Sequence, residues 1–187
     1  SAVAFNVGVV YEEQGEDGRA EQAFAEYARR GDKRALEAHV RAGRAGFRLG
    51  QLRRASDHFA SALGSWKRTS GKDKADVKGW AAEARYYQGE LLFREYEKVS
   101  LDVKPKLLNK SLKKKLDLLQ KAQGLYESIA DFEDAKWGTA ALFRAGHVFE
   151  LFSDSLTNAA TPKGLTEDEA NAYREGLDLY VVQVQEI

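Results

Sequence analysis

The sequence has no cysteine and no methionine, only two prolines, and no long apolar run. Without cysteine the chain can form no disulfide, no thiolate metal site and no thiol nucleophile. Without an apolar run of about 20 residues it offers no segment for direct insertion into a membrane as a helix. The formal net charge is +0, so no overall charge attracts the chain to nucleic acid or to an anionic lipid surface.

The absence of methionine extends to position 1, and the helical pattern of residues 180–187 is still running at the last residue. We therefore expect the chain to be a fragment of a larger protein, and we expect Leu177, Leu179, Tyr180 and Val181 to meet a following repeat or to pack back as a cap. Targeting segments could belong to the rest of that protein, so these features leave the compartment open.

Hydrophobic residues make up 43% of the chain and charged residues 31%, a composition that can bury a core and is not that of a disordered protein. Apolar residues recur at helical spacing, and runs of β-branched residues are almost absent. Glycine clusters and Pro105 divide the pattern into segments. We predict helices over about 2–14, 19–30, 33–49, 52–69, 74–96, 106–130 and 137–155, and a last one after Thr166, where Thr166 and Glu169 form a capping box.

One internal match indicates how these helices pack. The set Gly8, Ala20 and Phe24 recurs 35 positions later, without a gap, as Gly43, Ala55 and Phe59. A small residue on one helix, a second on the next and an aromatic one turn later allow two antiparallel helices to approach closely and to repeat. The predicted fold is all-α, a right-handed α-solenoid of about four antiparallel helix pairs. It forms a single domain over 1–187, in which 1–70 holds two recognisable repeats and 71–187 holds divergent helix pairs.

These positions resemble the tetratricopeptide repeat (TPR), in which a large residue, Leu, Gly and Tyr precede Ala, Phe and Ala. The first copy reads Ala4, Val7, Gly8, Tyr11, Ala20, Phe24 and Tyr27. The second reads His39, Ala42, Gly43, Gly46, Ala55, Phe59 and Ala62. The first helix of a third repeat is expected to place Trp80, Ala84 and Tyr87 at the large, Gly and Tyr positions. The repeat-end proline of the family is missing from both copies.

Residues 141–150 and 164–173 also look similar to divergent TPR proteins of myxobacterial and related cell envelopes, including those linked to gliding motility. This narrower resemblance implies a scaffold within a multiprotein machine, in the periplasm or at the outer membrane. A cytoplasmic location fits the composition equally well, so the localisation stays open.

The TPR resemblance also implies a concave groove lined by the first helix of each pair. Carried over to this chain, the groove positions are Phe5, Asn6, Val9, Glu13, Val40, Arg41, Arg44, Arg48 and, in the third repeat, Arg85. Arg41, Arg44 and Arg48 share one helix face, which would suit an acidic segment of a partner protein or peptide. The alternative is that these arginines pair with Glu37 or Glu83 on a solvated face. The carboxylate-clamp subclass of the family expects Lys and Asn where Phe5 and Val9 stand, so we do not expect its activity.

No arrangement of residues predicts catalysis. His39, His58 and His147 lack the spacing of a metal-binding or catalytic motif, so we expect no enzyme activity, metal or cofactor. The lysines of residues 104–121 have no interleaved aromatics where they are densest, and they do not predict nucleic-acid binding. The expected function is a non-catalytic protein–protein interaction or scaffolding module. The alternatives are a purely architectural spacer between flanking domains and a regulatory module of a larger enzyme.

Overall fold

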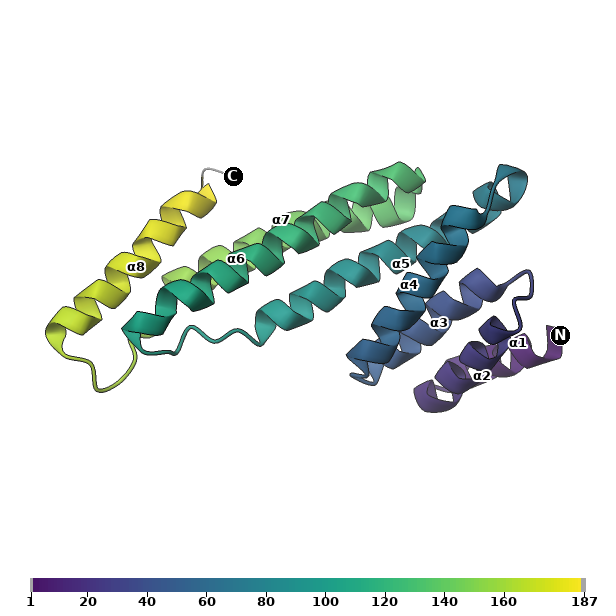
Figure 1. The fold of residues 1–187 in the computed structure, drawn as a ribbon, viewed down its shortest axis with the longest axis horizontal. Helices are drawn as coiled ribbons and strands as arrows, with labels where there is room; N and C mark the ends of the chain where they lie inside the picture. Colours follow the sequence, from purple (N-terminus) through teal and green to yellow (C-terminus); the bar gives the residue numbers. More distant parts are fainter. Residues whose placement is uncertain (1, 186–187) are drawn as a thin grey trace.

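The computed structural model describes residues 2–185, and within them the chain is all-helical, with no strand (Figure 1). The elements are α1 (Ala2–Glu13), α2 (Asp17–Arg29), α3 (Ala35–Arg48), α4 (Leu52–Arg68), α5 (Gly71–Glu97), α6 (Pro105–Glu127), the 3-10 helix η1 (Ser128–Phe132), α7 (Ala135–Thr157) and α8 (Glu167–Gln185). The all-α class expected from composition is confirmed.

The helices follow one another along the molecule. Each α-helix packs against the next in the chain, and α3, α5 and α7 also contact one another in succession, as do α6 and α8. Figure 1 shows α1 and α2 at one end of the long axis and α8 at the other. The 27-residue α5 is the central element, because it contacts α3, α4, α6, α7 and η1.

The internal sequence match corresponds to a close contact between an aromatic ring and a helical glycine. Phe24 of α2 lies on Gly8 of α1 so closely that a Cβ on Gly8 would stand 2.8 Å from the ring. Phe59 of α4 lies in the same way on Gly43 of α3, where a Cβ would stand 2.6 Å away. Only glycine leaves room for such an approach of ring to helix backbone.

A third copy of this contact joins α5 to α6. The Tyr126 ring lies on Gly89, where an added Cβ would overlap it, and Ala122 is buried one turn before Tyr126, as Ala55 is before Phe59. The expectation that Ala84 takes the glycine position is therefore corrected to Gly89. The sequence pattern misses it because residues 89 and 126 are 37 positions apart, whereas 8 and 24, like 43 and 59, are 16 apart.

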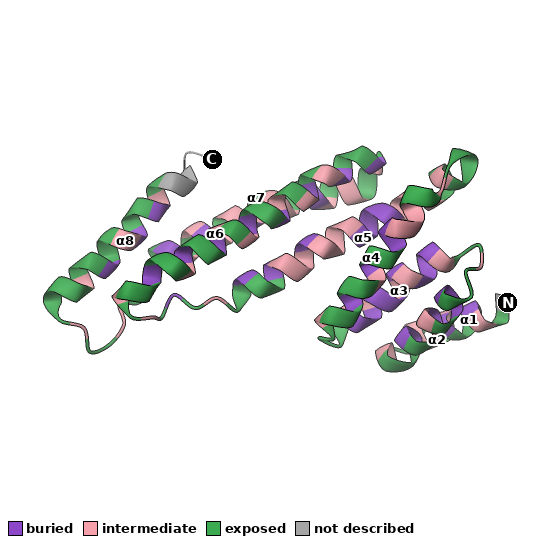
Figure 2. Ribbon diagram, viewed as in Figure 1, coloured by how far each residue is buried: buried purple, intermediate pink, exposed green. Residues whose placement is uncertain are grey.

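Apolar side chains form two core clusters that meet at α3. Ala38, Ala42 and Ala45 on one face of α3 pack with residues of α1 and α2. Leu36 and Val40, on another face, join the larger cluster that continues to α8. Figure 2 shows that α5 is buried or half-buried along most of its length, whereas α8 is largely exposed.

The start of α8 matches its sequence signature. The backbone N–H of Thr166 donates to the Glu169 carboxylate at 3.0 Å, and the N–H of Glu169 donates to the Thr166 hydroxyl at 3.3 Å. These bonds satisfy donors that a helix N-terminus leaves free, so the predicted capping box is present. Further along α8, Leu177 and Tyr180 are buried against the preceding helices, while Leu179 is exposed.

Candidate interaction surface

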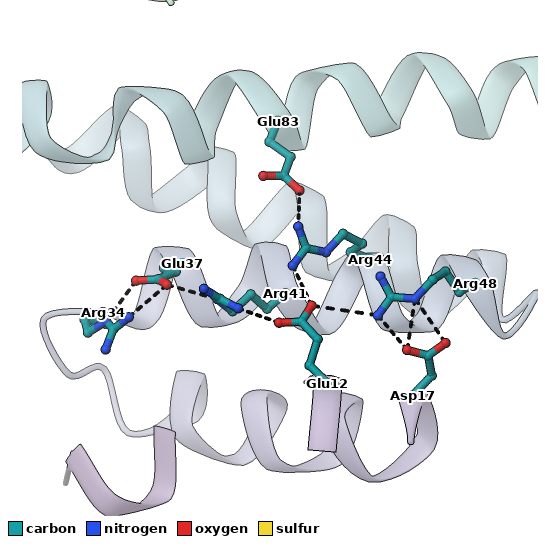
Figure 3. Close-up of polar contacts among 8 residues, drawn as sticks. All are labelled: Glu12, Asp17, Arg34, Glu37, Arg41, Arg44, Arg48 and Glu83. Atoms are coloured by element: carbon teal, nitrogen blue, oxygen red, sulfur yellow. Dashed lines mark hydrogen bonds and ion pairs between the residues drawn. The ribbon is translucent and has the colours of Figure 1, made fainter. Parts of the chain in front are cut away.

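The arginine row of α3, Arg41, Arg44 and Arg48, points toward α1, α2 and α5 (Figure 3). Every member of the row binds a carboxylate of its own chain. Arg41 donates to Glu12 of α1 and, at 2.9 Å, to Glu37 one turn earlier in α3. Because both carboxylates are mostly buried, they hold the Arg41 guanidinium in place.

Arg44 bridges three helices. Its Nη2 donates to Glu12 at 2.5 Å and its Nη1 donates to Glu83 of α5 at 3.0 Å. The Glu83 side chain is only 5% exposed, so Arg44 supplies the main compensation for a buried carboxylate. The pairings with Glu37 and Glu83 that the sequence offered as an alternative are both formed, but with mostly buried carboxylates rather than on a solvated face.

Arg48, the last residue of the row, contacts Asp17 at the beginning of α2. Its Nη2 lies 2.5 Å from an Asp17 carboxylate oxygen, and its Nε donates to the same group at 2.9 Å. Arg48 is the most exposed arginine of the three, and this pair is correspondingly more open to solvent. An acidic partner segment would have to compete with internal carboxylates along the whole row.

The electrostatics differ between the two acids that Arg44 joins. Burial raises the pKa of the Glu12 carboxyl, but Arg44 and Arg41 more than offset this and hold its pKa below the usual value. At Glu83 burial prevails and raises the pKa above the usual value, with Arg44 and Lys136 opposing it. Glu12 is therefore the firmly ionised centre of the network, and Glu83 is the member closer to protonation.

A second polar contact continues the connection toward α7. Arg144 of α7 donates to the Glu90 carboxylate of α5 at 2.7 and 3.0 Å, and the Tyr126 hydroxyl of α6 donates to it at 2.7 Å. Sequence reasoning missed this site because Glu90 and Arg144 are far apart in the chain. Once Gly89 is aligned with Gly43, Glu90 takes the repeat position of Arg44. This shared position is a sequence signal for an ion-pairing residue.

Two predicted groove residues lie in the core instead. Phe5 and Val40 are both fully buried, so neither offers surface to a partner. The reason is helical spacing, since each stands three residues before the glycine of its repeat and shares its inward face. The Phe5 ring contacts the Phe24 and Tyr27 rings at centroid distances of 5.3 and 5.2 Å.

The other predicted positions fall into two groups. On α1, Asn6 and Glu13 are exposed and Val9 is half-buried. One 35-residue repeat later, the positions of Asn6, Val9 and Glu13 are taken by Arg41, Arg44 and Arg48, in that order. Arg85 of α5 is half-buried, and its Nε is buried without a hydrogen-bond partner among the described residues.

When the repeats are aligned on Gly8, Gly43 and Gly89, Arg85 takes the position of Ala4 and His39. It therefore does not correspond to a member of the arginine row. We define the interaction row as the remaining set: Asn6, Val9, Glu13, Arg41, Arg44 and Arg48.

The histidines that look dispersed in the sequence are partly brought together. The Nδ1 atoms of His39 and His58 lie 3.2 Å apart between α3 and α4, and His58 Nε2 lies 3.2 Å from buried Glu21, which Arg54 also contacts. Burial and the facing His58 lower the pKa of His39 to about 4. Within residues 2–185 no group of three or more acidic or histidine side chains is arranged to hold a metal ion.

Comparisons with known proteins gave no match that bears on these residues. A scan against protein-family models and searches of curated proteins and of solved structures found no match to the chain. The TPR resemblance therefore rests on the sequence positions themselves. Within residues 2–185, no helix combines the length and the apolar character that a membrane-spanning segment requires.

Proposed function

We propose that the chain is a non-catalytic helical-repeat module, a right-handed α-solenoid of antiparallel pairs that serves protein–protein interaction or scaffolding. Support comes from the glycine–aromatic contact that joins α1 to α2, α3 to α4 and α5 to α6. Contacts of α3 with α5 and of α5 with α7 favour a continuous row of first helices. The narrower resemblance adds a cell-envelope or motility machine as the setting of this proposal.

The proposed mechanism is that a partner segment, helical or extended, lies along the interaction row. The observation that carries it is the ordering of that row: buried carboxylates fix the arginines, while Asn6, Glu13 and much of Arg48 stay open to solvent. A partner that meets prepositioned groups loses less conformational entropy on binding. Because the arginines are already neutralised, such a partner offers both hydrogen-bond donors and acceptors rather than acidic groups alone.

A capture experiment tests this mechanism. Wild-type protein and an Asn6→Arg, Glu13→Arg double variant are immobilised and exposed to lysate of the source cells. Both changes are on exposed positions of α1, so the fold should survive, which circular dichroism checks. We expect a partner retained by the wild type and by a Lys121→Glu control on α6, and lost by the double variant. Equal retention by all three proteins would remove the row as the binding site.

The internal neutralisation of the arginines also favours the architectural-spacer alternative. In that case the ion pairs serve only to fix the distance between the two ends of the stack. The capture experiment distinguishes the two functions, because a spacer gives no specific partner. Small-angle X-ray scattering of wild type and of Arg44→Met, without any ligand, tests the structural role of these pairs, since their loss should then change the maximum dimension.

A further inference from the structure

The outer face of α1 carries an exposed apolar stripe. Val3, Val7 and Val10 are 71%, 42% and 48% exposed, and their i, i+4, i+7 spacing places them on one side of the helix. No charged residue occurs among the first ten positions. A helix that is apolar on its inner and outer faces is typical of one covered on both.

The internal repeat indicates what covers such a face. One repeat later, Val3, Val7 and Val10 correspond to Ala38, Ala42 and Ala45 of α3. Those alanines are fully buried in the core cluster that also contains Tyr27 and Ala28 of α2. The stripe on α1 is therefore the counterpart of a surface on which the second helix of a neighbouring pair packs.

The opposite end of the molecule presents a matching feature. Leu179 and Val182 of α8 are 69% and 56% exposed, and with Glu175 and Asp178 they line an open hollow of about 410 Å³. Figure 1 places α8 and α1 at opposite ends of the long axis. The exposed aliphatic side chains of α1 and α8 therefore lie too far apart to meet within one copy.

We propose that the α1 stripe binds the Leu179–Val182 face of α8 from a second copy, so that copies associate head to tail. This inference rests on the solenoid arrangement of the proposed function. Charge disfavours the like-with-like contact at α8, since two such faces would bring Glu175 and Asp178 of each copy together. The uncharged α1 stripe presents no like charge to them. A contact between two different surfaces leaves one of each free after the first pairing, so association continues beyond a dimer, into a ring where the rotation closes and into an open chain where it does not.

The strength of the association follows from its size. Five exposed aliphatic side chains form a contact well below that of a stable interface. We therefore expect a weak association, with a dissociation constant on the order of 100 μM or higher. Aliphatic burial drives the contact, so added sulfate should strengthen it.

Sedimentation equilibrium over about two decades around that concentration tests the proposal. Four samples are compared: wild type, an α1 variant (Val7→Glu, Val10→Glu), an α8 variant (Leu179→Glu, Val182→Glu), and an equimolar mixture of the two variants. We expect the average mass of wild type to rise beyond that of a dimer, each variant to stay monomeric, and the mixture to stop at a dimer. The mixture retains one intact α1 stripe and one intact α8 face, which is enough for a single contact.

Several results would overturn the proposal. A wild type that stays monomeric throughout, an α8 variant that still self-associates through α1, or a mixture that stays monomeric would each do so. Leu142→Glu on α7 is the matched control, because it changes an exposed leucine that belongs to neither proposed face and should assemble like wild type. Partner capture by the α8 variant, with the interaction row intact, separates failure of this inference from failure of the proposed function.

Discussion

The regions α1–α4 and α5–α8 contain the same kind of helix–helix contact, but their helices differ in length. Helices α1 to α4 have 12 to 17 residues, whereas α5 to α8 have 19 to 27. A ring nevertheless lies on a helical glycine in both regions, at Gly43 in the first and at Gly89 in the second. What recurs between the regions is therefore a contact between two helices, and the number of residues that separates its members is free to change.

The two regions also differ in what accompanies that contact. In α1–α3 the core is built mainly of alanines with a few aromatic rings, and the ion pairs of Glu12 with Arg41 and Arg44 lie beside it. The larger cluster, which begins at α3 and α4 and extends to α8, is rich in leucine and aromatic side chains. Short alanine side chains bury less apolar surface per residue, so the first region should depend more on its charged network.

Removal of one arginine from each region should produce the largest difference. Arg44→Met leaves Glu12 without one of its cations and the nearly inaccessible Glu83 without its hydrogen-bonded one, and we expect it to lower the free energy of unfolding by about 3 kcal/mol. Arg144→Met should lower it by about 1–2 kcal/mol, because Glu90 keeps the hydrogen bond from the Tyr126 hydroxyl. Urea denaturation followed by circular dichroism measures both.

Lys121→Met provides the control for this pair of variants. Lys121 and Asp117 form an exposed pair within α6, so its loss should change stability by less than about 0.5 kcal/mol. If Arg44→Met and Arg144→Met prove equally destabilising, the proposed dependence of the first region on its charges is wrong.

Substitution of the glycines tests whether the shared contact is equally tight in the two regions. Gly43→Ala places a Cβ 2.6 Å from the Phe59 ring, and Gly89→Ala brings one still closer to Tyr126. Each change should lower the free energy of unfolding by about 1–3 kcal/mol, because the ring must move within a packed core. Thermal and urea unfolding of the two variants gives the comparison.

A third glycine shows what the same change does without a close neighbour. A Cβ at Gly124, in the interior of α6, would meet nothing within 4 Å. Gly124→Ala should therefore stabilise the chain by about 0.5–1 kcal/mol through helix propensity alone. The clash itself is verified if Phe59→Leu reduces the effect of Gly43→Ala in a double-mutant cycle. Strict additivity would mean that the loss at Gly43 has another origin.

The sequence predicts much of this architecture because its signals are local or regularly spaced. Helical periodicity, the glycine clusters and the capping box at Thr166 depend on neighbouring residues, and the prediction of an all-helical fold is confirmed. The Gly8 and Gly43 contacts were visible because one fixed offset relates them. The Gly89 contact was hidden because longer helices and the segment 98–104 separate its members, and no fixed offset finds it.

The candidate site was less predictable because its partners come from different helices. The spacing of Arg41, Arg44 and Arg48 within α3 indicates a shared face, but it cannot say whether that face meets solvent or the carboxylates of α1 and α5. The same limit explains why the sequence pattern predicts Phe5 and Val40 as groove residues although both are buried. Their orientation depends on which helix packs on them, and that information is distributed over the whole chain.

The two regions should also differ in their response to acid. Among the described residues, the pair of facing histidines lies in the first region, between α3 and α4. Burial and His58 lower the pKa of His39 to about 4, whereas an unfolded histidine has a pKa of about 6.5. The stability that depends on neutral His39 is therefore complete above pH 6.5 and is lost as the pH falls from 6.5 toward 4, since the unfolded chain binds the proton first.

Hydrogen exchange followed by mass spectrometry can locate this loss. Between pH 7 and pH 5 we expect protection factors to decrease in α3 and α4 more than in α6 and α7. Glu83 acts in the opposite direction, because a raised carboxyl pKa lets the folded protein take up a proton before the unfolded chain does. His39→Gln leaves Glu83 in place, so the difference between wild type and this variant isolates the histidine. An equal decrease in both proteins would show that the histidine pair does not make the first region more sensitive to acid.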